Sequence, residues 1–150
     1  MNKKTGVLIA VVVGIFLLCF TGGALFIKNA FQHVTEAVEK STVFGKSAIS
    51  DIGAEWSLDT YLVYADEFYK TESEKTKAKL MLAEFSKRLG KLKSLDAVEP
   101  VAKGARSVYE GDRAGFYVRV QTTGTFEKGK AKITVAVRNH KEKQSLTEIQ

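Results

Sequence analysis

The first feature of the sequence is a long apolar run near the amino terminus. Residues 7–20 read VLIAVVVGIFLLCF, where Cys19 is the only polar side chain, and the run resumes after a short break and ends at Ile27. A helix over residues 6–27 would be roughly 33 Å long, enough to cross a hydrocarbon core roughly 30 Å thick. Because such a helix has no polar face, it is not typical of a soluble domain. The pattern predicts a transmembrane helix over residues 6–27 after a short basic amino terminus, residues 1–5.

A cleaved signal peptide is the main alternative for this segment. Lys3 and Lys4 would form its basic start, and Gly22-Gly23-Ala24 would supply small residues for a peptidase. The apolar run continues past that point, which favours an uncleaved anchor. A lipoprotein signal fits less well, because Leu18 precedes Cys19 where a small residue is expected.

The distribution of charge does not by itself determine the orientation of the anchor. Lys3 and Lys4 precede the helix, and Lys28, Lys40 and Lys46 follow it, so the positive-inside count is nearly tied. We favour a bacterial signal anchor that places the domain outside the cytoplasm, in the periplasm or at the cell surface. The only cysteine lies in the apolar run, so the predicted domain has no disulfide bond.

Helical periodicity continues after the anchor. Residues 28–42 form a predicted juxtamembrane helical connector, with apolar positions at helical spacing, and residues 43–150 form the predicted domain. Residues 43–70 are typical of a helix in two pieces, the second capped by Ser57. Residues 71–90 show the strongest helical pattern.

The helix over residues 71–90 has a start signal and a stop signal. Thr71-Glu72-Ser73-Glu74 matches a capping box, in which the threonine side chain accepts a hydrogen bond from the amide of Glu74 and Glu74 reaches back. One apolar face is formed by Ala78, Leu82, Phe85 and Leu89. Gly90 suits the position after the helix, where a positive φ carries no Cβ penalty.

From about residue 95 the hydrophobic period changes to two. Phe116, Val118 and Val120 alternate with polar or aromatic neighbours, and residues 133–137 repeat the pattern, which is typical of half-buried strands. Turns are expected over residues 110–115 and 127–130, a weaker strand within 97–109 and a last strand over 145–150. Pro100 places the weaker strand at an edge or delays its start. The sequence therefore predicts an α+β domain with two or three helices packed on a three- or four-stranded antiparallel sheet.

Charge adds one candidate surface. The net charge is +6, and the most basic tract runs from Lys75 to Lys93. A solvated helix face explains this tract, and attraction to anionic lipid headgroups is the alternative for a tethered domain. The tract lacks the repeated interleaving of cations with aromatic residues that nucleic-acid binding requires, so nucleic acid is not an expected partner.

Motifs for catalysis and for cofactors are weak. Residues 124–130 match G-x-x-x-x-G-K, but Ala131 stands where a phosphate loop needs Ser or Thr, and strands are expected on both sides. His33, Glu36 and His140 do not amount to a zinc ligand set. No serine lies in a G-x-S-x-G elbow. We therefore expect no cofactor and no metal.

Carboxylates remain as candidates for acid–base chemistry. Asp59, Asp66 and Glu67 lie in the second helical piece or directly after it. Nothing in the sequence marks one of them as buried, so a solvated face is the favoured interpretation.

Two sets of residues are candidates for binding. Aromatic residues form either the core or a pocket between helix and sheet, and they are Trp56, Tyr61, Tyr64, Phe68 and Phe116. Small residues recur on one face of the anchor, where they would let two membrane helices approach closely, and they are Gly6, Ala10, Gly14 and Gly22.

The domain resembles small bacterial exported domains of unknown function with a cystatin-like, or nuclear-transport-factor-like, α+β fold. The residues that carry the resemblance are Trp56, the run from Phe85 to Leu92, Phe116-Tyr117-Val118, and Phe126-Glu127-Lys128-Gly129 before the strand over 133–137. The similarity covers roughly residues 45–150. It implies helices wrapped by an antiparallel sheet, and no set activity.

These observations support three hypotheses about function. The first is a non-catalytic interaction or assembly module at the membrane surface, with another membrane protein or a second copy of itself as partner. The second is a module that binds a small apolar ligand between helix and sheet. The third is a pocket enzyme that uses a carboxylate as acid or base.

Overall fold

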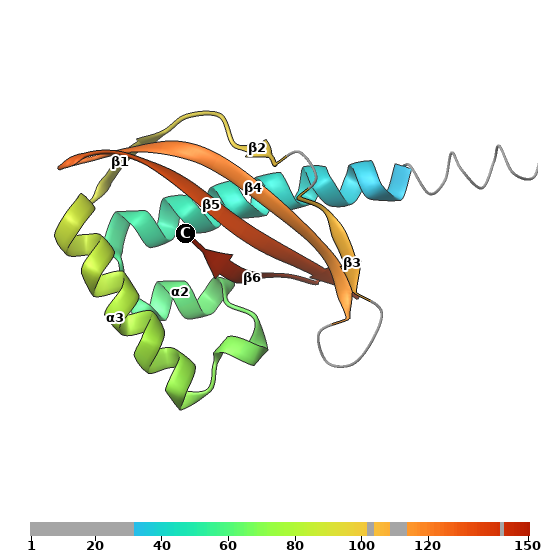
Figure 1. Ribbon diagram of the computed structural model, residues 1–150, viewed down its shortest axis with the longest axis horizontal. Helices are drawn as coiled ribbons and strands as arrows, with labels where there is room; N and C mark the ends of the chain where they lie inside the picture. Colours follow the sequence, from blue (N-terminus) through green and yellow to red (C-terminus); the bar gives the residue numbers. More distant parts are fainter. Residues whose placement is uncertain (1–31, 102–103, 109–113, 142) are drawn as a thin grey trace, which may run out of the picture. The chain divides into compact units, whose positions relative to one another are not determined.

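A compact α+β unit spans Ala37–Gln150 in the computed structural model, which describes residues 32–101, 104–108, 114–141 and 143–150 (Figure 1). The predicted membrane helix over residues 6–27 and its small-residue face lie outside the described residues. Within those described ranges, no helix is both long enough and apolar enough to cross a membrane.

The helical layer begins with a helix that the structure describes from residue 32 to residue 55, which we call the first helix. It is followed by α2 (Leu58–Tyr64), the short 3-10 helix η1 (Glu67–Tyr69) and α3 (Glu72–Leu89). The side chain of Ser57 accepts a hydrogen bond from the backbone N–H of Thr60, which fixes the start of α2. The predicted break at Ser57 is therefore confirmed.

Both ends of α3 follow from its sequence. Thr71 accepts a hydrogen bond from the backbone N–H of Glu74 at 3.4 Å, as the capping box predicts. The second half of the box is wrong, because the Glu74 carboxylate pairs with Lys77 at 2.7 Å instead of reaching back. Gly90 ends the helix with φ +71°, a conformation that is strained for any residue with a Cβ.

The sheet is antiparallel and has six strands, not three or four. Its main path runs β1-β4-β5-β6, and β2 and β3 also pair with β4. The strands are β1 (Leu92–Leu95), β2 (Glu99–Pro100), β3 (Arg106–Val108), β4 (Gly115–Phe126), β5 (Gly129–His140) and β6 (Lys143–Ile149). The number of strands exceeds the prediction because β4 is 12 residues long and has room for more than one partner strand on the same edge. Three short segments pair with successive parts of its outer edge, where Pro100 costs no central hydrogen bond.

The helices cover one face of the sheet, and the core lies between the two layers. Alternate residues of β4 and β5 point into it, including Val118, Val120, Val135 and Val137, all at most 1% exposed. Gly45 allows the first helix to approach closely, since a Cβ there would lie 2.6 Å from the Val120 side chain.

The first helix runs along the sheet in a defined direction. Ser41 is fully buried and its hydroxyl accepts a hydrogen bond from Asn139 at 2.8 Å. Gly53, twelve residues later, lies against Leu92, which pairs with Phe126 at the far end of β4. The helix therefore starts beside the β5–β6 end of the sheet and ends beside the β4–β5 hairpin.

Candidate functional site: an arginine pocket on the open face of the sheet

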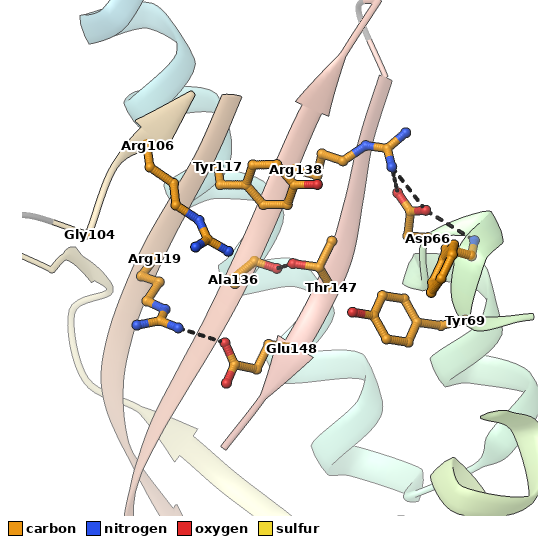
Figure 2. A pocket seen from close by; sticks show the side chains of 11 residues that line it. Asp66, Tyr69, Gly104, Arg106, Tyr117, Arg119, Ala136, Arg138, Thr147 and Glu148 are labelled. Carbon is orange, nitrogen blue, oxygen red and sulfur yellow. Dashed lines mark hydrogen bonds and ion pairs between the residues drawn. The ribbon is translucent and has the colours of Figure 1, made fainter. Parts of the chain in front are cut away.

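A cavity of about 370 Å³ lies on the sheet face opposite the helical layer. Residues from four strands, the β2–β3 connection and the segment before α3 surround it (Figure 2). They are Asp66, Phe68, Tyr69, Gly104, Arg106, Tyr117, Arg119, Ala136, Arg138, Thr147 and Glu148. We call this cavity the arginine pocket.

Strand register builds the first row of the pocket. Arg106 of β3 pairs with Tyr117 of β4, Tyr117 pairs with Arg138 of β5, and Arg138 pairs with Ser145 of β6. Side chains opposite each other in neighbouring strands lie on the same sheet face, so these four form one line across the sheet. The guanidinium of Arg106 lies 5.4 Å from the centroid of the Tyr117 ring, which is a cation–π contact.

Asp66 closes this row at the edge of the sheet. The chain reaches β6 there, because the backbone N–H of Asp66 donates to the carbonyl of Leu146 at 2.9 Å. The Asp66 carboxylate pairs with Arg138 at 3.3 Å and accepts from the hydroxyl of Ser145 at 2.5 Å. Asp66 is buried and Arg138 is mostly buried, with side chains 6% and 14% exposed, so removal of either partner would leave the other charge poorly hydrated.

Asp66 also places two aromatic rings beside the pocket. Its carboxylate accepts from the backbone N–H of Phe68 at 3.1 Å, which caps η1. Phe68 and Tyr69 pack edge to face, with centroids 5.7 Å apart, and both line the cavity. The expectation of a solvated carboxylate is therefore wrong for Asp66, which sequence reasoning could not place against residues 72 and 79 positions away.

A second row forms the floor and the opposite wall. Arg119 of β4 and Glu148 of β6 form an ion pair at 3.0 Å across β5. Ala136, which pairs with both residues in register, lies beneath them and leaves space because its side chain is small. The pair is partly exposed, so its contribution to stability is small, on the order of 1 kcal/mol or less.

Among the described residues, the charges around the pocket leave one cation without a carboxylate partner. Three arginines and two carboxylates line it, and each carboxylate already pairs with one arginine. Arg106 forms no ion pair with any described carboxylate, and its guanidinium lies over the Tyr117 ring instead. Figure 2 shows Arg106 and Tyr69 on opposite sides of the space above Ala136. A guanidinium fork beside an aromatic wall is suited to bind a planar anion.

The structure does not gather the predicted aromatic residues around one cavity. Phe68 lines the arginine pocket and is 46% exposed, whereas Tyr61 is buried and Phe116 packs against the core. Burial raises the pKa of Tyr61, because the phenolate would lose its hydration. Tyr64 donates a hydrogen bond to Asp51, which raises its pKa to about 12.

Trp56 is a structural anchor at the end of the first helix. Its indole N–H donates to the carbonyl of Gly90 at 2.7 Å, and its ring stacks on Phe126 and packs against Phe85. Trp56 adopts φ +51°, which is uncommon for a residue with a Cβ. These contacts join the first helix, α3 and β4 and do not reach the arginine pocket.

The sequence analysis did not identify Arg106, Tyr117, Arg119 or Arg138 as site residues. Tyr117, Arg119 and Arg138 were expected only at the outward-facing positions of the predicted strands, and Arg106 lies in the segment where a weaker strand was expected. One signal was present. The chain has five arginines, and three of them fall on these strands, whereas its other cations are lysines. Arginine recognises planar anions better than lysine does, so the arginines on the predicted strands could have indicated an anion-binding site.

No group of three or more His, Cys, Asp or Glu side chains that could hold a metal ion occurs within the described part of the chain. Comparison of the chain with protein-family models, curated proteins and solved structures found no significant match.

Proposed function

We propose that the protein is a membrane-anchored, non-catalytic binding module that holds a carboxylate group of a ligand or partner in the arginine pocket. The observation that carries the proposal is Arg106, a pocket arginine with no carboxylate partner among the described residues, placed between an aromatic ring and a small-residue floor. The anchor is the apolar segment over residues 6–27.

The charge balance supports a singly charged ligand group. One carboxylate would neutralise the excess cation, and Arg106 can offer it two parallel N–H donors. Phe68 and Tyr69 add an apolar wall, which favours a carboxylate attached to a flat or aromatic body over a fully hydrated ion. An acidic side chain or a chain terminus of a partner protein would supply the same chemistry.

The other two functions have less support. A purely apolar ligand would have to cover the Arg106 guanidinium without supplying a compensating charge, which is costly. An acid–base enzyme would need a carboxylate that can exchange a proton. Asp66 and Glu148 each form an ion pair with an arginine, so neither carboxylate is presented alone to a substrate in the cavity.

The cystatin-like assignment belongs to the same proposal. Its support is the single helical layer on one face of an antiparallel sheet, with the strands β4, β5 and β6 consecutive in the chain and in space (Figure 1). In that arrangement the second sheet face stays open, and the arginine pocket lies on it.

The proposal is tested by calorimetric titration of the full chain in detergent micelles with benzoate as the probe. We expect saturable benzoate binding by the wild type. Arg106→Ala should weaken it by about tenfold or more, because a hydrogen bond to a charged group contributes roughly 1.5–3 kcal/mol. Arg106→Lys should retain part of the affinity, since it keeps the charge and loses the fork.

Arg88→Ala is the matched control, because Arg88 is exposed on α3 and its one ion pair within the described ranges is with Glu84. It removes the same charge away from the pocket and should leave benzoate binding unchanged. Equal loss in both variants would mean that net charge, not the pocket, attracts the anion. Saturable binding that Arg106→Ala leaves intact would overturn the proposal.

A further inference from the structure

A second group of cations gathers where α3 ends and the β4–β5 hairpin turns. It comprises Lys87 and Arg88 of α3, Lys91 and Lys93 around the start of β1, and Lys128 and Lys130 around the hairpin, all exposed. We call these six residues the basic tip. It contains the carboxyl-terminal part of the basic tract that the sequence shows, and the strand register adds the hairpin lysines to it.

Most charges of the basic tip have no carboxylate partner in the part of the chain that the structure describes. Glu84 pairs with Arg88, and the Glu127 carboxylate accepts from the backbone N–H of Lys91. No described carboxylate forms an ion pair with any of the five lysines, and Lys128 donates to the backbone carbonyl of Lys87 at 2.6 Å. The amino-terminal part of α3 differs, because Lys75 and Lys77 each pair with a glutamate.

The aromatic residues near the basic tip point inward. Phe85 and Phe126 both pack against Trp56, with centroids 5.5 and 5.9 Å from its ring. Single-stranded nucleic acid is held by exposed aromatic rings interleaved with cations, and these two rings are used by the core. At the turn itself, a Cβ added to Gly129 would meet nothing within 4 Å, so the hairpin projects into solvent.

Lysine suits a broad phosphate surface better than one shaped ligand. Its ammonium is a compact, hydrated point charge, whereas the fork of arginine selects a single planar anion. The arginine pocket and the basic tip therefore differ in chemistry as well as in place. For a chain with a predicted anchor, the phosphate surface at highest local concentration is the bilayer.

We infer that the basic tip is a docking surface for an anionic lipid bilayer. The inference rests on the predicted anchor and is independent of the arginine pocket. Residues 37 and 55 are separated by about 27 Å along the first helix, and the tip lies beside the residue-55 end. Charges at a surface act over only about 8 Å at physiological salt. If the basic tip docks on the bilayer that holds the anchor, both ends of the first helix must therefore be close to the headgroups, so that helix would lie nearly along the membrane surface.

The fluorescence of the single tryptophan can report this contact. Trp56 is the only tryptophan in the chain, and it bonds to Gly90, directly before Lys91. Full-length protein is reconstituted in phosphatidylcholine vesicles that contain a dansyl-labelled lipid, with or without phosphatidylglycerol. Energy transfer from Trp56 to the dansyl group reports how near the basic tip lies to the headgroups.

We expect transfer to rise when phosphatidylglycerol is present and to fall back when sodium chloride is raised. Each lysine near an anionic bilayer contributes a factor of roughly five to the docking equilibrium. The double variant Lys128→Glu/Lys130→Glu should therefore weaken docking by about 25-fold or more, which would remove the rise. Circular dichroism and the Trp56 emission maximum of that variant should match the wild type, since both residues are exposed.

The matched control is Lys46→Glu/Lys143→Glu, which makes the same charge change at exposed positions outside the tip. It should keep the rise in transfer. Equal transfer in neutral and anionic vesicles would overturn the inference, and so would equal loss in both double variants. Binding of soluble polyphosphate by protein in neutral vesicles, without a rise in transfer on anionic ones, would assign the tip to a soluble polyanion instead.

Discussion

Asp66 is the residue on which the architecture of the arginine pocket depends. One carboxylate binds Arg138 of β5, Ser145 of β6 and the backbone N–H that starts η1. It joins the edge of the sheet to the segment that carries Phe68 and Tyr69. A single side chain therefore links the stability of the domain to the shape of the pocket.

Replacement of Asp66 by asparagine should be strongly destabilising. The variant keeps the size of the side chain and removes its charge, so the mostly buried Arg138 loses its ion pair with Asp66. Breaking a buried pair in this way costs about 3–5 kcal/mol. Chemical denaturation of the full chain in micelles, followed by circular dichroism, measures the loss.

Asp59→Asn is the comparison for that measurement. Asp59 is exposed in the first turn of α2, where its charge interacts with the helix dipole. Its replacement should cost less than about 1 kcal/mol. If the two variants lost equal stability, the contacts of Asp66 with β5 and β6 would not be the source of its contribution.

At the scale of elements, α3 shows a helix whose limits are local properties of the chain. Thr71 supplies the cap, Gly90 supplies the positive φ after the last turn, and Ala78 and Leu82 supply the buried face. The cap and the turn at Gly90 are local, and the apolar spacing that marks the buried face is visible in the sequence before its packing partners are known. This is why the sequence predicts the helix within one residue at each end.

Thr71→Ala should lower stability by about 1 kcal/mol, because the backbone N–H of Glu74 then loses its capping partner. Thr76→Ala provides a matched control in the same helix. Thr76 is exposed and its hydroxyl donates to the carbonyl of Glu72, so alanine there should be neutral or slightly stabilising. Denaturant midpoints of the two variants and the wild type give the comparison, and a Thr76→Ala loss as large as that of Thr71→Ala would contradict the capping role.

The sheet was predictable only in part. Alternation identified the inward residues of β4 and β5, such as Val118 and Val135, because burial imposes a period of two. It did not reveal which strands are neighbours or in what register. The line from Arg106 to Ser145 exists only through three successive registers, and the contact of Asp66 with Arg138 spans 72 residues. The pocket therefore could not be read from spacing along the chain.

At the scale of the whole molecule, the two proposed contact surfaces occupy different parts of one compact unit. The arginine pocket lies on the open sheet face, and the basic tip lies where α3 meets the β4–β5 hairpin. If the tip lies against anionic lipid, the pocket stays on a separate surface and is accessible to a ligand or partner. Anchoring, orientation and recognition would then be carried by different residues, which can be altered one at a time.

Anchoring is the property on which the membrane proposals depend. We expect the full chain to sediment with membranes after alkaline carbonate treatment and to be released by detergent, with its amino terminus intact by mass spectrometry. Val12→Arg/Leu17→Arg should shift the chain into the aqueous fraction, because each arginine at the centre of a membrane helix costs roughly 2.5–3.5 kcal/mol of insertion. Val34→Arg adds a charge at a position 45% exposed in the first helix and should leave the membrane fraction unchanged. An intact wild-type chain in the aqueous fraction would contradict the anchor and the lipid contact of the basic tip, while carboxylate binding in the arginine pocket could still be measured on that soluble protein.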